Sequence, residues 1–322
     1  MNEKVILNAI NDIDDDLLSL DERKTKKLSG SWKVLIAAAL IMVFSVTAYA
    51  VGNITTSYNT KVIDGEGLYT LYYGDVDEAE FYEMTVEYKL EPQKVSEEFY
   101  ADCVAALHYD YKTVQQTYRD YNNEEYVLPE GEELWASLNF YFDVNDERNN
   151  YTVDELEEYM GLDFCLGDEI REGINYLAER RKAKKTSLWP CSITLTGKKV
   201  SEAEGGFVPT GVTVSFIVDY DNKGNFVYAY TYISLSEEKT TATSVWNSYE
   251  KEGKWKEKII KTDSGKEIYF IHNNPQKGFR SNARAYWTED GIGYEAYAAM
   301  AYDWEHKGEA VKYLKPFVKS IE

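Results

Sequence analysis

The sequence has few of the residues on which metal and disulfide chemistry depend. It holds only three cysteines and three histidines in 322 residues. An odd number of cysteines allows at most one disulfide, and the absence of a CxxC spacing excludes the common zinc and redox motifs. The histidines show no HxxxH or His-Cys spacing either. We therefore expect no metal or other cofactor, and cysteines that serve as small buried side chains.

Catalytic and calcium-binding motifs are also missing. The sequence contains no GxSxG elbow, Walker loop or GxGxxG fingerprint. Asp219–Asn225 ("DYDNKGN") begins like a calcium loop, but Lys223 and Tyr230 stand where two oxygen ligands belong. A hairpin turn explains this stretch better, as it does Thr288–Gly293 ("TEDGIG"). Neighbouring acidic residues pair by chance among 56 of them, so we expect no enzymatic activity.

Basic charge is scarce, with 35 Lys and Arg against 56 Asp and Glu and a net charge of −21 at pH 7. Residues 1–33 carry six basic and seven acidic residues, so nearly all of the imbalance lies after the first 51 residues. A nucleic-acid binder needs a positive footprint, so nucleic acid is excluded as a partner. The basic cluster at residues 178–185 ("AERRKAKK") suits a helix C-terminus, and binding of an anionic wall polymer or of lipid headgroups is the alternative.

One long segment has no charge at all. From Val34 to Val51 all eighteen residues are uncharged, and ten are Val, Leu, Ile, Met or Phe. As a helix it would be about 27 Å long, close to the bilayer core of about 30 Å. Five basic residues precede it: Arg23, Lys24, Lys26, Lys27 and Lys33. The positive-inside rule therefore predicts a cell-membrane helix over residues 34–52, with the N-terminus cytoplasmic and the C-terminal part extracytoplasmic.

A cleaved signal peptide is the alternative. Ala48-Tyr49-Ala50 is an A-x-A-like cleavage site, which would release a protein beginning at Val51. However, the apolar run is longer than the core of an ordinary leader, and 33 residues precede it where leaders have only a few. We therefore favour a retained anchor.

The first 33 residues form a head with an apolar stripe. Apolar side chains recur at spacings of four, three, four and three residues, as on one side of a helix. They are Ile6, Ile10, Ile13, Leu17 and Leu20. Asp14–Asp16 suits a helix interior poorly, so two short helices with a break there are the alternative. Because so short a segment cannot form its own core, the stripe predicts an amphipathic helix that binds a cytoplasmic partner.

Residues 53–150 show both strand and helix patterns. A strand is predicted near Leu68–Tyr73, and a clearer one over Met84–Leu90, where apolar and polar residues alternate. Ser96 is a helix N-cap, followed by two acidic residues in the first turn. The apolar face of that helix comprises Phe99, Cys103 and Leu107. A third strand runs from Leu134 to Val144, with apolar residues on one side.

Residues 151–322 begin with two helices and continue with strands. Thr152 and Glu155 have the spacing of a capping box, and Gly161 ends the short helix that follows. A second helix is predicted near residues 168–185. The predicted strands are Ser192–Leu195, Val212–Tyr220, Phe226–Leu235, Ile268–His272, Arg284–Trp287 and Tyr294–Ala299. A last helix covers residues 306–322, with a break at or near Pro316.

Helices and strands are segregated along the chain rather than alternating. This order predicts an α+β fold with antiparallel sheets. The polar stretch "DVNDERNN" divides it into two extracytoplasmic modules, 53–150 and 151–322, which follow the head (1–33) and the membrane helix (34–52). Tyr228, Tyr230 and Tyr232 share one face of a strand, where cross-strand packing is commoner than a platform for sugars or peptides.

Three stretches resemble a family of Gram-positive membrane proteins: "ILNAINDIDDDLL", "YTVDELEEYMGLDF", and "GKEIYFIHNN" with the Trp-x-x-Asp-Gly hairpin and final helix that follow it. Members are often encoded beside extracytoplasmic-function sigma factors and are treated as anti-sigma or sensor proteins with an ectodomain of unknown function. The resemblance implies a sigma factor as cytoplasmic partner. Zinc-type anti-sigma heads carry a His and Cys cluster, whereas residues 1–33 contain neither residue.

Two functions remain open from the sequence. The first is a single-pass signalling protein whose outer domain senses a ligand in the envelope and whose head contacts a cytoplasmic regulator. The second is a membrane-tethered or secreted module that binds wall polysaccharide or peptide, with the head serving only to orient the chain in the membrane.

Overall fold

The computed structural model describes residues 56–59, 70–75, 81–138, 146–183, 189–221, 225–249, 255–273, 280–300 and 309–321. The predicted head and membrane helix, with the stripe and the basic flank, lie outside these ranges. No helix within the ranges is long and apolar enough to cross a membrane. The chain from Thr56 to Glu322 forms one compact unit.

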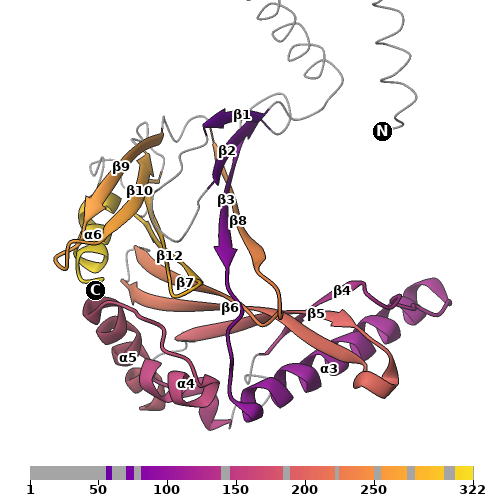
Figure 1. Ribbon diagram of the computed structural model, residues 1–322. Coiled ribbons are helices and arrows are strands. Elements are labelled where there is room, and N and C mark those ends of the chain that lie inside the picture. The colour runs from indigo at the N-terminus through magenta and orange to yellow at the C-terminus, as the bar shows by residue number, and fades with distance from the viewer. Residues whose placement is uncertain are drawn as a thin grey trace, which may run out of the picture. The chain divides into compact units, whose positions relative to one another are not determined.

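Two sheets make up most of this unit (Figure 1). Sheet A has the strand order β1-β2-β3-β8, and sheet B has the order β4-β5-β6-β7-β12-β11-β10-β9. The strands are β1 (Thr56–Asn59), β2 (Thr70–Asp75), β3 (Phe81–Leu90), β4 (Glu133–Ser137), β5 (Cys191–Lys199), β6 (Phe207–Tyr220), β7 (Phe226–Ser234), β8 (Thr240–Tyr249), β9 (Trp255–Lys261), β10 (Glu267–Asn273), β11 (Asn282–Glu289) and β12 (Ile292–Ala299). Neighbouring strands in both sheets run antiparallel, so the predicted α+β fold with antiparallel sheets is confirmed.

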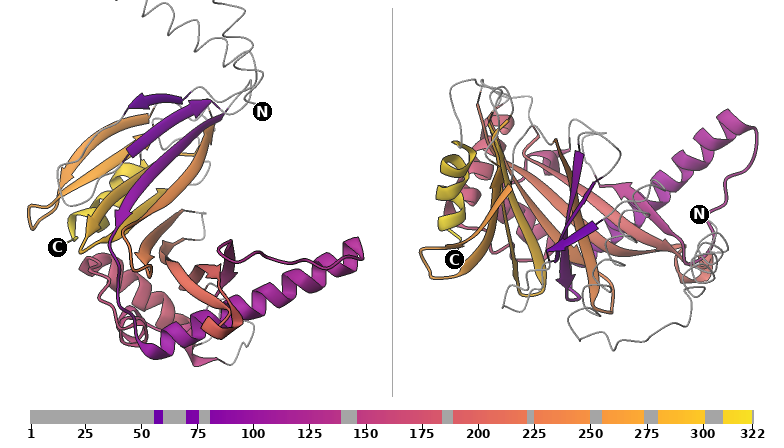
Figure 2. Two further views of the ribbon diagram at one scale, coloured as in Figure 1. Left: turned by 45° about the vertical axis from the view of Figure 1, so that its right-hand side comes forward. Right: turned by 90° about the horizontal axis from the view of Figure 1, so that it is seen from above.

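The helices cover one face of sheet B. They are α3 (Glu97–Asn122), α4 (Val153–Met160), α5 (Asp168–Lys182) and α6 (Glu309–Lys319), with 3-10 turns η2 (Glu147–Asn150) and η3 (Glu202–Glu204). Helix α3 packs on β4, β5 and β6, α5 packs on β6, and α6 packs on β9 to β12. Sheet A lies on the opposite face of sheet B, as Figures 1 and 2 show. Sheet B therefore separates a helical layer from sheet A.

Local sequence signals set the helix ends as predicted. The Ser96 side chain accepts a hydrogen bond from the Phe99 N–H at 3.1 Å, which caps α3. Thr152 and Glu155 form the predicted capping box at α4, and Gly161 ends that helix in the left-handed conformation with φ 72°. The capping side chains supply partners for N–H groups that have none within the helix.

Both predicted hairpins are present. β6 and β7 are joined at residues 221–225, where the Asn225 N–H donates to Asp221 Oδ1 at 3.0 Å. β11 and β12 are joined by Asp290 and Gly291, which have positive φ angles of 48° and 76°. Two consecutive left-handed residues are the signature of the turn that best matches the twist of a hairpin.

Three strands, β1, β8 and β9, were not predicted from the sequence. The residues of β8 that face sheet B are Ala242, Ser244 and Trp246, a set with too little apolar character to show a clear period. β9 is an edge strand rich in lysine, so its alternation is masked by charge. β8 and β9 are recognisable only through the partners with which they pair, β3 and β10.

Two helix ends also differ from prediction. The helix predicted to end near residue 185 ends at Lys182. Helix α6 continues through Pro316 to Lys319, where a break was predicted at or near the proline. Proline lacks the N–H that would bond to the carbonyl four residues earlier. Its position in the last turn, exposed to solvent, leaves little helix beyond it to disrupt.

Strand pairing joins the two stretches that the polar break separates in the sequence. β3 pairs with β8, and β4 pairs with β5, so each sheet contains strands from both sides of residue 150. The cysteines are free thiols, of which Cys103 is buried and Cys165 and Cys191 are half-buried.

Candidate functional site

The two faces of sheet B differ in chemistry. Side chains that point toward the helices are apolar and buried, among them Leu134, Ile193, Leu195, Val212, Val214 and Phe216. Because alternate residues point to opposite faces, their neighbours form the other face. On β4 to β7 these neighbours include Trp135, Ser137, Ser192, Thr194, Thr196, Thr213, Ser215, Ile217, Tyr228, Tyr230 and Tyr232. This second face divides into a covered half and an open half.

Sheet A covers one half of this face, over β7, β12, β11 and β10. The core between the sheets consists of Met84, Val86, Tyr88, Leu90, Tyr232, Trp246, Tyr269, Ile271 and Tyr286. The rings of Tyr88 and Tyr232 are stacked with centroids 4.7 Å apart, and the Tyr88 hydroxyl donates to the Tyr294 carbonyl at 3.2 Å. We call this region the covered half.

A buried ion pair lies in the covered half. Arg284 on β11 forms an ion pair with Glu295 on β12, whose side chain is only 1% exposed. Glu295 Oε2 also accepts hydrogen bonds from Ser244 Oγ at 2.7 Å and from the Tyr232 hydroxyl at 3.1 Å. Ser244 belongs to sheet A, so the carboxylate links the two sheets. Its acceptor sites thereby receive the partners that a buried charge requires.

Aromatic rings enclose the guanidinium of Arg284. Its central carbon lies 4.2 Å from the ring centroid of Trp246 and 4.1 Å from that of Tyr297. Burial alone would lower the pKa of Arg284, but the charge of Glu295 and the neighbouring tyrosines together outweigh burial and raise the pKa. Burial, with a smaller contribution from Glu295, raises the pKa of Tyr230 to about 12. The arginine is thus permanently charged, and the phenols stay protonated well above neutral pH.

The open half of the face forms a groove beside sheet A. Its volume is about 450 Å³, and it lies between β8 on one side and β4 to β7 on the other. Figures 1 and 2 show β4, β5 and the adjoining part of β6 extending to one side of sheet A, with α3 on their other face. Nine of the 17 residues that line the groove carry a hydroxyl group. The threonines among them include Thr196, Thr213, Thr241 and Thr243.

Charge is almost absent from the groove. Only Glu133 and Lys198 are charged among its described lining residues, and they face one another as partners in β4 and β5. Trp135 stands two residues along β4 from Glu133, and its side chain is 65% exposed. It is the only tryptophan more than a third exposed in the part of the chain that the structure describes. An exposed indole beside a polar groove is a common feature of ligand-binding surfaces.

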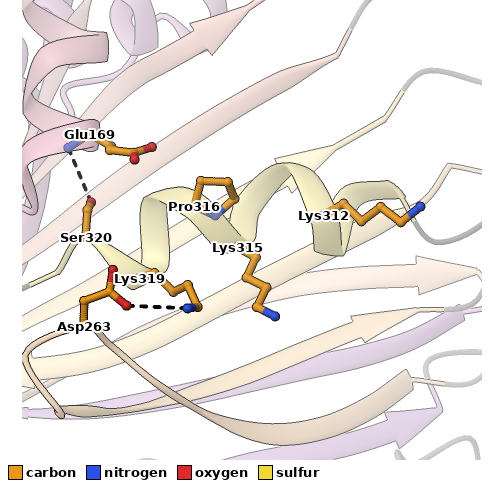
Figure 3. A pocket seen from close by; sticks show the side chains of 7 residues that line it. All are labelled: Glu169, Asp263, Lys312, Lys315, Pro316, Lys319 and Ser320. Atoms are coloured by element: carbon orange, nitrogen blue, oxygen red, sulfur yellow. Dashed lines mark hydrogen bonds and ion pairs between the residues drawn. The ribbon is translucent and has the colours of Figure 1, made fainter.

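A second hollow, of about 410 Å³, lies beside α6 (Figure 3). Lys312, Lys315 and Lys319 line it together with Glu169 and Asp263. The Lys319 amine lies 3.5 Å from Asp263 Oδ1, whereas Figure 3 shows Lys312 and Lys315 extending outward from the helix. Lysines and carboxylates are mixed here on an exposed helix, which is the usual composition of a solvated surface.

The basic cluster and the tyrosine row predicted from the sequence have structural roles. Lys182 forms ion pairs with Glu155 and Glu179, and Arg181 stacks on Trp189 with its central carbon 3.4 Å from the ring centroid. Of the three tyrosines on β7, Tyr232 is buried under sheet A and Tyr228 stacks on Tyr230. The tyrosine row therefore takes part in aromatic packing, which was the favoured interpretation of the sequence.

Neither the groove nor the ion pair was predicted from the sequence. Trp135 carried a usable signal, because it lies on the polar side of a strand whose other side holds Leu134 and Ala136. Glu295 carried another, as an acidic residue between the apolar residues of β12. The predicted head residues Ile6, Ile10, Ile13, Leu17 and Leu20, and the basic flank, lie outside the described ranges.

Within the described ranges, no three side chains of His, Cys, Asp or Glu gather in positions suited to a metal ion. Comparison of the chain with protein-family models, with curated proteins and with solved structures finds no match. The site must therefore be interpreted from its own geometry.

Proposed function

We propose that the chain is a single-pass membrane protein whose extracytoplasmic domain binds, and thereby senses, a ligand in the cell envelope without enzymatic activity. The observation that carries this proposal is the hydroxyl-lined groove with the exposed Trp135 at its side. Its side chains suit hydrogen bonding and stacking, and the buried polar groups beside it are held in fixed contacts within the covered half. A preformed groove on a rigid sheet is a suitable ligand-binding surface.

The proposed topology follows the sequence. Residues 1–33 form an amphipathic cytoplasmic head, and residues 34–52 form the membrane helix. The modules 53–150 and 151–322 lie outside the cytoplasm, and their shared sheets make them act as one domain. Ligand binding in the groove would therefore affect both modules.

Fractionation tests this topology directly. The full-length chain should remain in washed membranes, with its C-terminus accessible to protease from the outside of intact cells. Recovery from the medium of a protein that begins at Val51 would contradict the anchor and favour the cleaved leader.

The head supplies the signalling part of the proposal. Its stripe of Ile6, Ile10, Ile13, Leu17 and Leu20 is suited to the groove of a cytoplasmic regulator, such as the sigma factor that the family resemblance implies. Ile10→Asp combined with Leu17→Asp should abolish capture of that partner while leaving membrane insertion intact. Asn11→Asp with Ser19→Asp adds the same charge to the polar side and serves as the matched control.

A membrane-tethered or secreted binding module for wall polysaccharide or peptide is the second candidate. It is favoured by the same groove, because ligand binding there requires nothing from the head. If the stripe variant captures the same cytoplasmic proteins as the unmodified chain, this second candidate replaces the first.

A further inference from the structure

We infer that the groove between β8 and strands β4 to β7 takes an uncharged polysaccharide chain. The inference deepens the proposed function and rests on it, since it names the class of ligand for the same groove. It depends on three independent features of the lining: its charge, its hydroxyl groups and its exposed indole.

Charge separates the groove from the rest of the molecule. The chain as a whole is 28% charged with a net charge of −21, yet only Glu133 and Lys198 are charged among the 17 described residues that line the groove. These two are paired partners on neighbouring strands, so they largely cancel. An anionic ligand would find no positive field here, and a cationic one would bind more readily to the acidic surface elsewhere. A neutral ligand fits best.

Hydroxyl groups on the sheet B side of the groove are available for hydrogen bonding. Thr196 and Thr213 rise from sheet B into the groove, whereas Thr241 and Thr243 lie along the edge of β8 on the face that points away from sheet B. Among the described residues, none offers a hydrogen-bond partner to these four side-chain hydroxyls. Each hydroxyl can both donate and accept, as can the hydroxyls of a sugar. The hydroxyls of a polysaccharide could therefore replace the water that solvates Thr196 and Thr213.

Trp135 offers the third feature, a flat apolar face. Its cross-strand partner is Thr196, a small residue that leaves the indole uncovered. The C–H groups on one side of a pyranose ring form an apolar patch, which stacks well on such a face. Because β4 is the last strand of sheet B, a long chain can pass over Trp135 and continue beyond the sheet.

A peptide would need features that the groove lacks. Peptide recognition on a sheet takes its specificity from pockets that hold alternate side chains. The apolar residues Leu90, Val212 and Ile233 lie at the floor but are at most 3% exposed, so the described lining presents no apolar pocket. The same lack of exposed apolar surface argues against an acyl chain.

Calorimetry on the full-length protein in detergent tests the inference, with soluble hexasaccharides of glucose and of N-acetylglucosamine as probes. At least one of the two should bind, and Trp135→Ala should weaken that binding about tenfold or more. Trp135→Phe, which keeps an aromatic face, should retain most of the affinity. Tyr121→Ala, at an 86% exposed position on α3 away from the groove, is the matched control and should bind as the unmodified chain does.

Two further measurements define the ligand class. Thr196→Val and Thr213→Val each remove a hydroxyl from the sheet B side of the groove at nearly constant shape, and each should weaken binding several-fold. Affinity should stay nearly constant between about 0.05 and about 0.5 M salt, because the interaction is uncharged. Affinity that falls steeply with salt would overturn the inference, as would tighter binding of polyphosphate than of either sugar.

The remaining outcomes separate this inference from the proposed function. Failure of both sugar series overturns the inference, and so does binding of an uncharged Gly/Ser/Thr peptide in their place. The peptide result would leave the groove as the ligand site and keep the proposed function. Sugar binding by a protein that is secreted would instead keep the inference and contradict the membrane anchor.

Discussion

The covered and open halves of the same sheet face carry polar side chains of the same kind but use them differently. In the covered half, Tyr232, Arg284 and Glu295 bond to one another or to Ser244 of sheet A. In the open half, Thr196 and Thr213 face the groove and the solvent. Because strand β7 contributes to both halves, the local sequence alone does not decide which role a polar residue takes. The role depends on whether sheet A covers the residue.

The two halves should therefore differ in how much stability a substitution costs. A buried polar group costs free energy unless it is paired, whereas a solvated one loses little when it is replaced. Substitutions of similar size should therefore have large effects on the stability of the covered half and small effects in the open half.

Glu295→Leu should have the largest effect, because it leaves the enclosed Arg284 charge without its partner. We expect the free energy of unfolding to fall by about 3–5 kcal/mol in urea titrations. Adding Arg284→Met should recover much of that loss, since no unpaired charge then remains. Thr213→Val is the control in the open half, where a change within about 0.5 kcal/mol is expected. A single Glu295→Leu variant as stable as the unmodified chain would contradict the contrast.

Alkaline pH should have the second-largest effect, by lowering the stability of the covered half. Burial raises the pKa of Tyr230 from 10.0 to about 12, and it raises those of Tyr232 and Tyr286 well above 10.0. As pH rises above 10, the unfolded chain loses these phenol protons before the folded protein does. The free energy of unfolding therefore keeps its full value below pH 10 and falls as pH rises to about 12, the pKa of Tyr230 in the folded protein. For Tyr230 alone the loss is about 2–3 kcal/mol.

Urea unfolding at several pH values between about 9 and 11.5 measures this loss. Tyr230→Phe should flatten the dependence, because a phenylalanine has no proton to lose. Tyr121→Phe, at an exposed position, should leave the dependence unchanged. Equal slopes for the two variants would show that the covered phenols do not set the alkaline limit.

A pair of strand glycines sharpens the comparison further. A Cβ atom on Gly293, in the covered half, would lie 2.8 Å from Tyr88 Cδ1, and that ring is fully buried. A Cβ atom on Gly211, in the open half, would lie no closer than 3.7 Å to its neighbours. Gly293→Ala should therefore lose about 1–3 kcal/mol through overpacking, whereas Gly211→Ala should stay within about 0.5 kcal/mol. Thermal unfolding of the two variants, compared side by side, decides this.

Local features of the fold were predictable because neighbouring residues determine them. Ser96, Thr152 and Gly161 act on hydrogen bonds within one turn of their own positions, and the alternation of Met84–Leu90 reflects a single strand. Such signals hold whatever the rest of the chain does. They located most of the helices and strands.

The site was not predictable for the opposite reason. β3 pairs with β8 across about 160 residues of sequence, and this pairing determines which part of sheet B is covered. Ser244 occupies a buried position of β8, but it is polar because its hydroxyl donates to the buried Glu295 on sheet B. Its residue type therefore gave no sign of the buried face of a strand. Trp135 and Tyr232 are both aromatic residues in strands, yet only long-range pairing exposes the first and buries the second.

Trp135→Ala should have a small effect on stability, like the substitutions at Thr213 and Gly211 in the open half. The side chain is 65% exposed on an edge strand, so little apolar surface returns to water when it is removed. We expect the free energy of unfolding to change by no more than about 0.5 kcal/mol, similar to Tyr121→Ala. Urea titration of both variants measures it without any ligand. A loss of more than about 1.5 kcal/mol would mean that the indole packs as the covered aromatics do. Weakened sugar binding could then no longer be attributed to stacking. An unchanged stability would instead leave ligand contact as the reason for an exposed tryptophan beside a neutral groove.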